Sequence, residues 1–264
     1  MTICIGILCD NGQAVVAVSD KLVTGPNIEF EHTQEKIIKL NEYCVALSAG
    51  SALRHVELYN RVKRSMNEIE KPTISNISEL VKKHYIELRN SCFEELILKP
   101  RSLNLVEFYH TMRNFPDGFA SFIERLNNEF TYQITVLVCG VDNIGGHIYI
   151  VGNPGVAEVF DSIGCAAIGI GAQHAHISLI SNRCFQNTPL KQAIYFAMEA
   201  KICSEIAPGV GKDTDMLIVK KDKITGINED VIKNLRIIFE EKINPEYRKG
   251  VVKRIEEIDF GGVI

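Results

Sequence analysis

The chain has 264 residues and a mass of 29.5 kDa, which allows one large domain or two small ones. Hydrophobic residues make up 46% and charged residues 23% of the sequence. This is ordinary globular usage and argues against a disordered or fibrous chain. The formal net charge of −4 argues against partners such as nucleic acid or an anionic membrane. No apolar stretch reaches about 18 residues, so no membrane span is predicted.

The eight cysteines indicate a reducing environment. No C-x-x-C pair occurs, and most cysteines lie inside apolar runs, as small buried hydrophobic residues do. A disulfide framework or a zinc site is therefore not predicted. The N-terminus lacks the basic region and apolar core of a signal peptide, so we expect a cytoplasmic location.

The first fifty residues predict strands. Residues 3–9 and 13–18 are apolar runs joined by an Asn-Gly turn, in which both residues tolerate the positive φ of a tight hairpin. A polar loop follows, and residues 36–40 and 43–48 then predict a second hairpin. All four runs are rich in apolar residues, as in a sheet that helices cover.

The apolar period then changes to that of helices. One helix carries a stripe that ends at Met66, with Ser51 as its cap, and a second opens at Asn76. Residues 103–129 continue the helical period, with a break at Pro116. The stripe in this stretch favours core packing over a lid or ring contact. Its apolar residues are Val106, Tyr109, Met112, Phe119, Phe122 and Leu126.

The second half predicts more strands, two helices and a final strand pair with a last helix. The order of strands, helices, strands, helices and strands favours two sheet layers with helices outside over a parallel βαβ fold. We therefore expect one domain over 1–264, with a helical insertion at about 99–130 and a C-terminal extension at about 243–264. The predicted ranges are strands 133–141, 147–152, 156–160 and 165–170, a helix from about 173, a helix 189–205 capped by Thr188, strands 215–220 and 223–227, and a helix 229–242.

The second residue is chemically distinctive. Met1 precedes Thr2, and an initiator methionine is normally removed before a small side chain, so we expect a free Thr2 amine. The pKa of an α-amino group is about 7.7–8, which leaves part of it neutral near physiological pH. That amine can take the proton of its own hydroxyl, so one residue supplies both nucleophile and base.

Such a site also needs a positive charge, a carboxylate that orients the charge, and a backbone N–H for the oxyanion. Lys36, Asp20 and Gly50 stand at predicted strand ends that can meet at one edge of a sheet. Each also has a plainer interpretation. Asp20 and Gly50 can be turn residues, and Lys36 can be a solvated charge.

Several short stretches share their order and spacing with one known family, and together they span about residues 2–66 and 132–227. On these stretches the sequence resembles the proteasome β-subunit family, including the bacterial HslV-type peptidases. The distance from Asp20 to Lys36 matches the family's aspartate-to-lysine distance. The matching stretches are 2–7, 11–12, 14–20, 24, 35–40, 49–50, 167–175 and 210–215.

The resemblance implies an α+β fold, a four-layer αββα sandwich of the N-terminal-nucleophile (Ntn) hydrolase type. It also implies a homo-oligomeric ring with the sites facing an inner chamber, and a threonine-type peptidase that cleaves peptides or unfolded proteins. Carried over by position, Thr2 is the nucleophile and base, Lys36 tunes it, Asp20 pairs with Lys36, and the Gly50 N–H is the oxyanion donor. Any ATP dependence comes from a separate ATPase unfoldase. No cofactor or metal is implied.

Two departures leave an alternative open. Ile170 stands where the family usually has a serine that relays protons, and the family's aspartate and serine before the last strand are replaced near Ala207 and Val210. Asp213 or Ser204 could substitute, although their spacing differs. One such group is worth about 10²–10⁴ in rate. The alternative is a non-catalytic ring or scaffold subunit of the same fold.

Other candidate sites have plainer explanations. His174 and His176 are two residues apart, so they do not share a helix face and do not suggest a metal pair. Cys4 and Cys9 lie in an apolar strand and are expected in the core rather than as nucleophiles. The Gly169–Gly171 turn is too short for a phosphate-binding loop.

Overall fold

The structure is a computed structural model in which contacts divide the chain into two compact units, residues 1–226 and 227–264. The two units are described separately. The predicted Ser51 cap and the predicted 243–264 extension lie outside the described residues. The residues that the structure describes are 2–24, 29–31, 36–50, 54–114, 116, 118–130 and 132–242.

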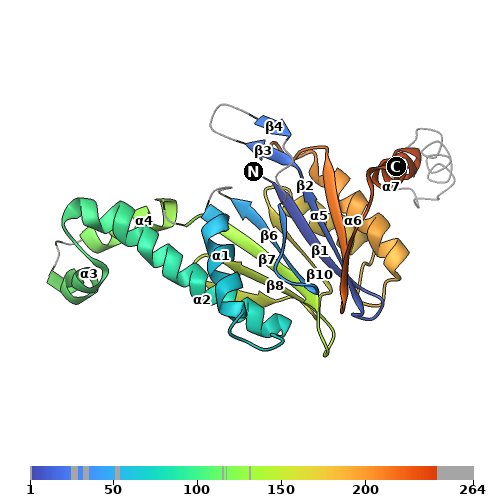
Figure 1. The fold of residues 1–264 in the computed structure, drawn as a ribbon. Helices are drawn as coiled ribbons and strands as arrows, with labels where there is room; N and C mark the ends of the chain where they lie inside the picture. Colours follow the sequence, from blue (N-terminus) through green and yellow to red (C-terminus); the bar gives the residue numbers. More distant parts are fainter. Residues whose placement is uncertain are drawn as a thin grey trace, which may run out of the picture. The chain divides into compact units, whose positions relative to one another are not determined.

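The first sheet is antiparallel and contains the start of the chain (Figure 1). Asp10 and Asn11 have φ values of 50° and 56° in the predicted turn, and the two strands that it joins are buried along their whole length. The strand order is β10-β1-β2-β11-β12. The strands are β1 (Ile3–Cys9), β2 (Ala14–Asp20), β10 (Cys165–Gly169), β11 (Thr214–Lys220) and β12 (Lys223–Gly226).

The second sheet is also antiparallel, with the order β5-β6-β7-β8-β9. An apolar cluster with members from both sheets, such as Cys4, Leu47 and Leu137, fills the space between them. Two short strands form a separate antiparallel hairpin in the stretch where the sequence predicts only a polar loop. Three residue pairs join these two strands. The strands are β5 (Ile37–Lys39), β6 (Cys44–Gly50), β7 (Ile134–Val141), β8 (Gly146–Gly152) and β9 (Val156–Val159), with β3 (Leu22–Thr24) and β4 (Glu29–Glu31) in the hairpin.

Helices cover the outer face of each sheet (Figure 1). One pair packs on the second sheet through a cluster that includes Leu58, Val81 and Val138; the other packs on the first sheet. This confirms an α+β fold with two antiparallel sheets and helices outside them. Within the described residues, no helix combines the length and apolar character needed to cross a membrane. The four covering helices are α1 (Arg54–Met66), α2 (Ile74–Phe93), α5 (Ala172–Ser181) and α6 (Leu190–Ser204). The second unit, described by itself, contains α7 (Glu229–Lys242).

Two predicted helix starts are wrong. The second helix begins at Ile74 rather than Asn76, because Thr73 is the cap and Asn76 completes a capping box by accepting from the Thr73 N–H at 3.1 Å. The helix predicted from residue 189 begins at Leu190. Its first N–H donates to the Asp10 carboxylate at 2.9 Å, while the predicted cap, Thr188, accepts from another loop N–H.

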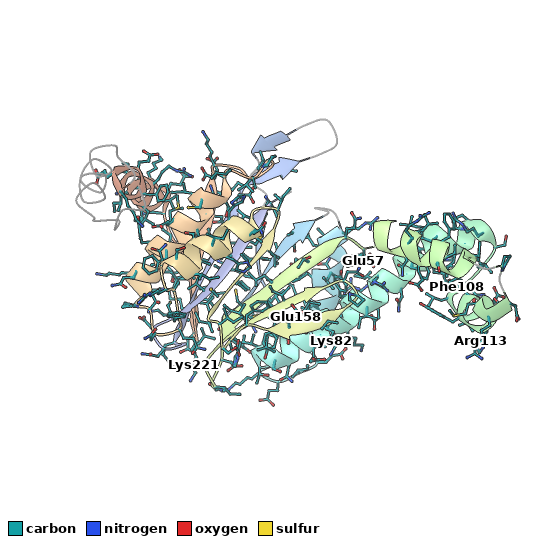
Figure 2. All side chains as sticks on the ribbon, turned by 180° about the vertical axis from the view of Figure 1, so that it is seen from behind. Glu57, Lys82, Phe108, Arg113, Glu158 and Lys221 are labelled. Carbon is teal, nitrogen blue, oxygen red and sulfur yellow. The ribbon has the colours of Figure 1, made fainter. Side chains whose placement is uncertain are left out.

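Between α2 and β7 the chain forms a helical arm with its own small core. Phe108, labelled in Figure 2, is fully buried in that core. Val106 and Tyr109 are 67% and 50% exposed, so the predicted core stripe is wrong for α3 and its true core residue lies between them. The arm's elements are η1 (Glu94–Leu98), η2 (Lys99–Arg101), α3 (Leu105–Thr111), η3 (Met112–Asn114) and α4 (Phe119–Phe130).

Candidate active site

Three of the four predicted site residues meet at one edge of the first sheet. Thr2 immediately precedes β1, Asp20 ends β2, and Lys36 precedes β5. The Thr2 hydroxyl donates to Asp20 Oδ1, and Lys36 Nζ donates to Thr2 Oγ1 at 2.7 Å. Antiparallel pairing brings the start of β1 beside the end of β2, which explains how residues 18 positions apart touch.

The Lys36 ammonium group uses all three of its N–H donors in hydrogen bonds. Besides Thr2, its Nζ donates to Asp20 Oδ1 at 2.8 Å and to the Leu22 carbonyl at 2.7 Å. The Lys36 side chain is 14% exposed and that of Asp20 is fully buried. A largely desolvated charge is tolerated when it is paired and fully hydrogen-bonded, and both conditions hold for this ammonium.

Asp20 is held on both of its oxygens. Oδ1 accepts from the Ile3 N–H at 3.1 Å in addition to Thr2 and Lys36. Oδ2 accepts from the N–H groups of Leu22 at 3.3 Å and Gly211 at 3.0 Å. Charge-assisted hydrogen bonds of this kind fix a carboxylate firmly. The sequence could not reveal the backbone groups among them, because any residue carries them.

The fourth predicted residue, Gly50, is not joined to Thr2 by a hydrogen bond in the described part of the chain. It ends β6 opposite Ile134 with a φ of +115°, and a Cβ there would lie 2.1 Å from the Gln133 carbonyl. Close packing therefore explains a glycine at this position without catalysis. The Cys4 thiol, two residues after Thr2, donates to the Ser48 carbonyl at 3.6 Å, which brings the end of β6 near the site. The oxyanion role of Gly50 stays a prediction.

The turn after β10 lies directly against Thr2. Gly169 has a φ of +102°, and a Cβ there would lie 2.2 Å from the Thr2 carbonyl. Only glycine permits this close approach, so Gly169 allows the turn to pack against the Thr2 backbone, a contact that the sequence alone did not show. Ile170, next in the chain, is 49% exposed and brings no proton-relay group.

Cys4 is a second nucleophilic side chain in this region. It contacts Thr2 and is fully buried, and burial raises the pKa of its thiol to about 12. Because the thiolate is the reactive form, Cys4 remains an unreactive thiol near neutral pH. Burial also raises the pKa of the Cys9 thiol to about 12, and all eight cysteines are free.

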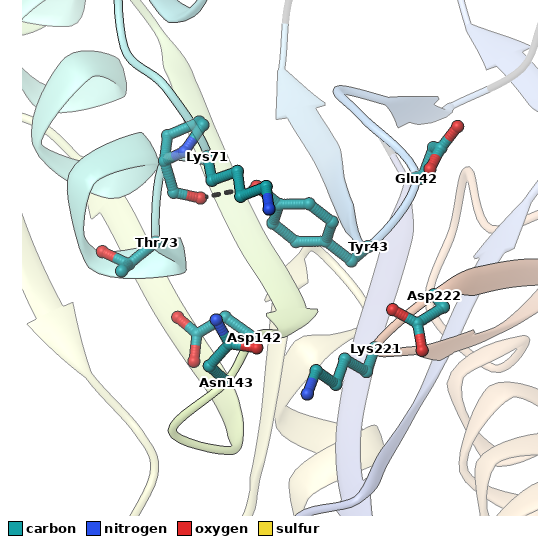
Figure 3. Close-up of a pocket in the computed structure, with 9 residues that line it drawn as sticks. Glu42, Tyr43, Lys71, Thr73, Asp142, Asn143, Lys221 and Asp222 are labelled. Carbon is teal, nitrogen blue, oxygen red and sulfur yellow. Dashed lines mark hydrogen bonds between the residues drawn. The ribbon is translucent and has the colours of Figure 1, made fainter.

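A pocket of about 340 Å³ lies at the other end of the strands (Figure 3). Tyr43, which lines the pocket, lies just before the start of β6, whereas the Thr2 site lies near the end of β6. The Tyr43 hydroxyl donates to the Pro72 carbonyl at 2.7 Å. The pocket therefore does not belong to the Thr2 site. Its lining residues are Glu42, Tyr43, Lys71, Pro72, Thr73, Asp142, Asn143, Lys221 and Asp222.

His147 joins two carboxylates in this region. Its Nδ1 lies 2.6 Å from Asp161 Oδ2 and its Nε2 lies 3.6 Å from Asp142 Oδ1. Among the described residues, no group of three His, Cys, Asp or Glu side chains is arranged to hold a metal ion.

Of the two histidines on α5, His176 accepts a hydrogen bond from the Ala167 N–H of β10 at 3.1 Å.

We expect His147 to make stability depend on pH. The hydrogen bond to Asp161, with both nearby carboxylates, raises its pKa above 6.5. A raised native pKa adds stability that is complete below the unfolded pKa and is lost as pH rises through the native pKa. His147→Gln should therefore lower the free energy of unfolding more at pH 6 than at pH 8.5, by about 1 kcal/mol or less. Urea unfolding at both pH values measures this, and an equal loss at both would contradict it.

Comparisons with known proteins add no family: no protein-family model matches the chain, and no curated protein matches its sequence. The chemistry must therefore be inferred from the chain's own residues. In the described part of the chain, the Thr2 site combines a hydroxyl, a buried carboxylate and a paired ammonium in mutual contact. That combination can activate a hydroxyl for attack on a carbonyl group.

Proposed function

We propose that the chain is a threonine-type peptidase of the Ntn-hydrolase type, similar to proteasome β-subunits, that acts through Thr2 after Met1 is removed. The observation that carries the proposal is the Thr2 hydroxyl held between Asp20 and Lys36. Two sheets with helices on their outer faces, which is the layer order expected of that fold, support it. The resemblance also implies assembly into a ring of identical chains.

The proposed reaction is acyl transfer. The free Thr2 amine takes the hydroxyl proton as Oγ1 attacks the peptide carbonyl, and the carbonyl electrons move to its oxygen. The C–N bond then breaks, the leaving nitrogen takes the proton, and an ester to Thr2 remains. Water adds to the ester, returns a proton to Thr2 and releases the acid. Lys36 stabilises negative charge that develops on Oγ1, and Asp20 keeps Lys36 in place.

Access to the nucleophile sets a condition on this proposal. In the chain as it stands, Thr2 is only 3% exposed. A peptide must bring its carbonyl carbon within about 3–3.5 Å of the attacking oxygen. Catalysis therefore requires a Thr2 hydroxyl that is more exposed in the mature protein, as well as a free Thr2 amine.

We expect the mature protein to lack Met1 and to form a covalent adduct on Thr2 with a β-lactone. The free amine activates the hydroxyl, which opens the strained lactone ring to give an ester. Intact mass before and after treatment, with peptide mapping of the adduct, measures both events.

Thr2→Ala is the matched control and should form no adduct. Cys4, the nearest thiol, should stay unlabelled because burial keeps it protonated. Retention of Met1 together with no adduct in the wild-type chain would overturn the proposal.

A second candidate function is a non-catalytic ring or scaffold subunit. The observation that favours it is the exposed Ile170, which offers no proton relay beside Thr2. In that case Thr2→Ala would leave assembly unchanged, and neither the wild type nor the variant would hydrolyse peptides. A peptidase signal that disappears in Thr2→Ala would reject this candidate.

A further inference from the structure

Lys201 on α6 is a fully buried lysine. An ammonium group in the interior is tolerated only when charge and hydrogen-bond partners compensate it. Its Nζ donates to Glu205 Oε1 at 2.6 Å and to the Lys212 carbonyl. The lysine thus ties the end of α6 to a position just before β11.

The segment 205–213, which Lys201 anchors, reaches the candidate active site on both sides of Lys212. On one side the Gly211 N–H donates to Asp20 Oδ2 at 3.0 Å. On the other side the Asp213 carbonyl accepts from the Lys21 N–H at 3.2 Å. Lys212, whose carbonyl Lys201 binds, therefore lies between the Gly211 N–H, which binds Asp20, and the Asp213 carbonyl, which binds the next residue, Lys21.

The same segment also packs against the turn that lies beside Thr2. A Cβ on Gly171 would lie 3.1 Å from Val210 Cγ2 and 2.9 Å from Ser204 Cβ. Gly171 follows Gly169 by two residues, and Gly169 lies against the Thr2 carbonyl. A shift of this segment would consequently disturb the site from two directions, through Asp20 and through this turn.

We propose that Lys201 is a positioning residue of the Thr2 site: it fixes the segment 205–213 so that the Gly211 N–H holds the Asp20 carboxylate against Lys36. It touches none of the proposed reacting atoms and acts through the backbone. The effect on catalysis rests on the proposed function, whereas the effect on the segment does not.

Two measurements on Lys201→Met in the full, assembled protein test the proposal. Methionine keeps most of the aliphatic volume and removes the ammonium group. Hydrogen–deuterium exchange of residues 205–213 should become about tenfold faster, because the segment loses its anchor. For peptide hydrolysis, kcat should fall about 10- to 100-fold with KM within about twofold, since a displacement near 1 Å can cost about 100-fold in rate.

Glu199→Gln is the matched control. Glu199 is also buried on α6, but it accepts from Asn182 Nδ2 at 2.8 Å, next to α5. This variant should leave exchange of 205–213 and kcat near wild type even if it lowers overall stability. If Lys201→Met does not fold, Lys201→Gln, which retains a donor, should show both effects in smaller measure.

The outcomes separate this inference from the proposed function. Faster exchange with reduced kcat and unchanged KM supports the positioning role. Unchanged exchange, or equal changes in Lys201→Met and Glu199→Gln, would overturn it. If the wild-type protein hydrolyses no peptide and forms no adduct, the proposed function fails, while exchange of 205–213 still decides whether Lys201 anchors the segment that holds Asp20.

Discussion

Replacement of Thr2 by alanine is expected to reduce peptide hydrolysis by at least about 10,000-fold. The change removes the attacking oxygen, and loss of a nucleophile typically removes nearly all covalent catalysis. It also removes one of the three acceptors of the Lys36 ammonium. Initial rates with a fluorogenic peptide measure the loss, and circular dichroism shows whether the variant remains folded.

Thr2→Ser is the matched control because it retains the hydroxyl and the free amine after trimming. We expect it to keep measurable hydrolysis and β-lactone labelling. If Thr2→Ala retained more than about a tenth of the wild-type rate, the nucleophile would have to be another group. Cys4 is the nearest alternative, and its protonated, buried thiol argues against it.

Replacement of Asp20 by alanine is expected to lower the free energy of unfolding by about 3–5 kcal/mol. It leaves the largely buried Lys36 ammonium without a counter-charge. It also removes the acceptor of three backbone N–H groups, on Ile3, Leu22 and Gly211. Urea unfolding measures the loss. Asp222→Ala, in an exposed turn, is the control and should change stability by less than about 0.5 kcal/mol.

A double variant separates the lost pairing from the other effects of this change. Lys36→Met in the Asp20→Ala background removes the uncompensated charge, so it should recover part of the lost stability. Both single variants should lack peptide hydrolysis. If the double variant were less stable than the wild type by the sum of the two single losses, the two side chains would contribute independently, and their ion pair could not explain the effect.

The strands and most helices follow from local patterns in the sequence. The Asn-Gly turn and the apolar runs beside it correctly predict β1 and β2. The start of α2 was missed because either Thr73 or Asn76 can cap a helix, and in the structure they form one capping box. In the arm, α3 is too short for its apolar spacing to show which face enters the arm's core, and the spacing does not predict Phe108 as its core residue.

At the candidate site, the side chains could be anticipated but their backbone partners could not. Residue type, position at strand ends and the spacing of a resemblance predict Thr2, Asp20 and Lys36 as site residues, and the structure brings them into contact. The Leu22 carbonyl and the Gly211 N–H were missed. Every residue carries such groups, and only the closed tertiary structure decides which of them point at the site.

The join between Asp20 and the far part of the chain has a consequence for biosynthesis. Asp20 pairs with Thr214 across the sheet and accepts from Gly211, which is 191 residues away. Ribosomes release the N-terminal end first, so Thr2 and Asp20 emerge long before these partners exist. The carboxylate obtains its full set of hydrogen bonds only after almost the entire first unit has been translated, which delays assembly of the candidate site until the protein around it is nearly complete.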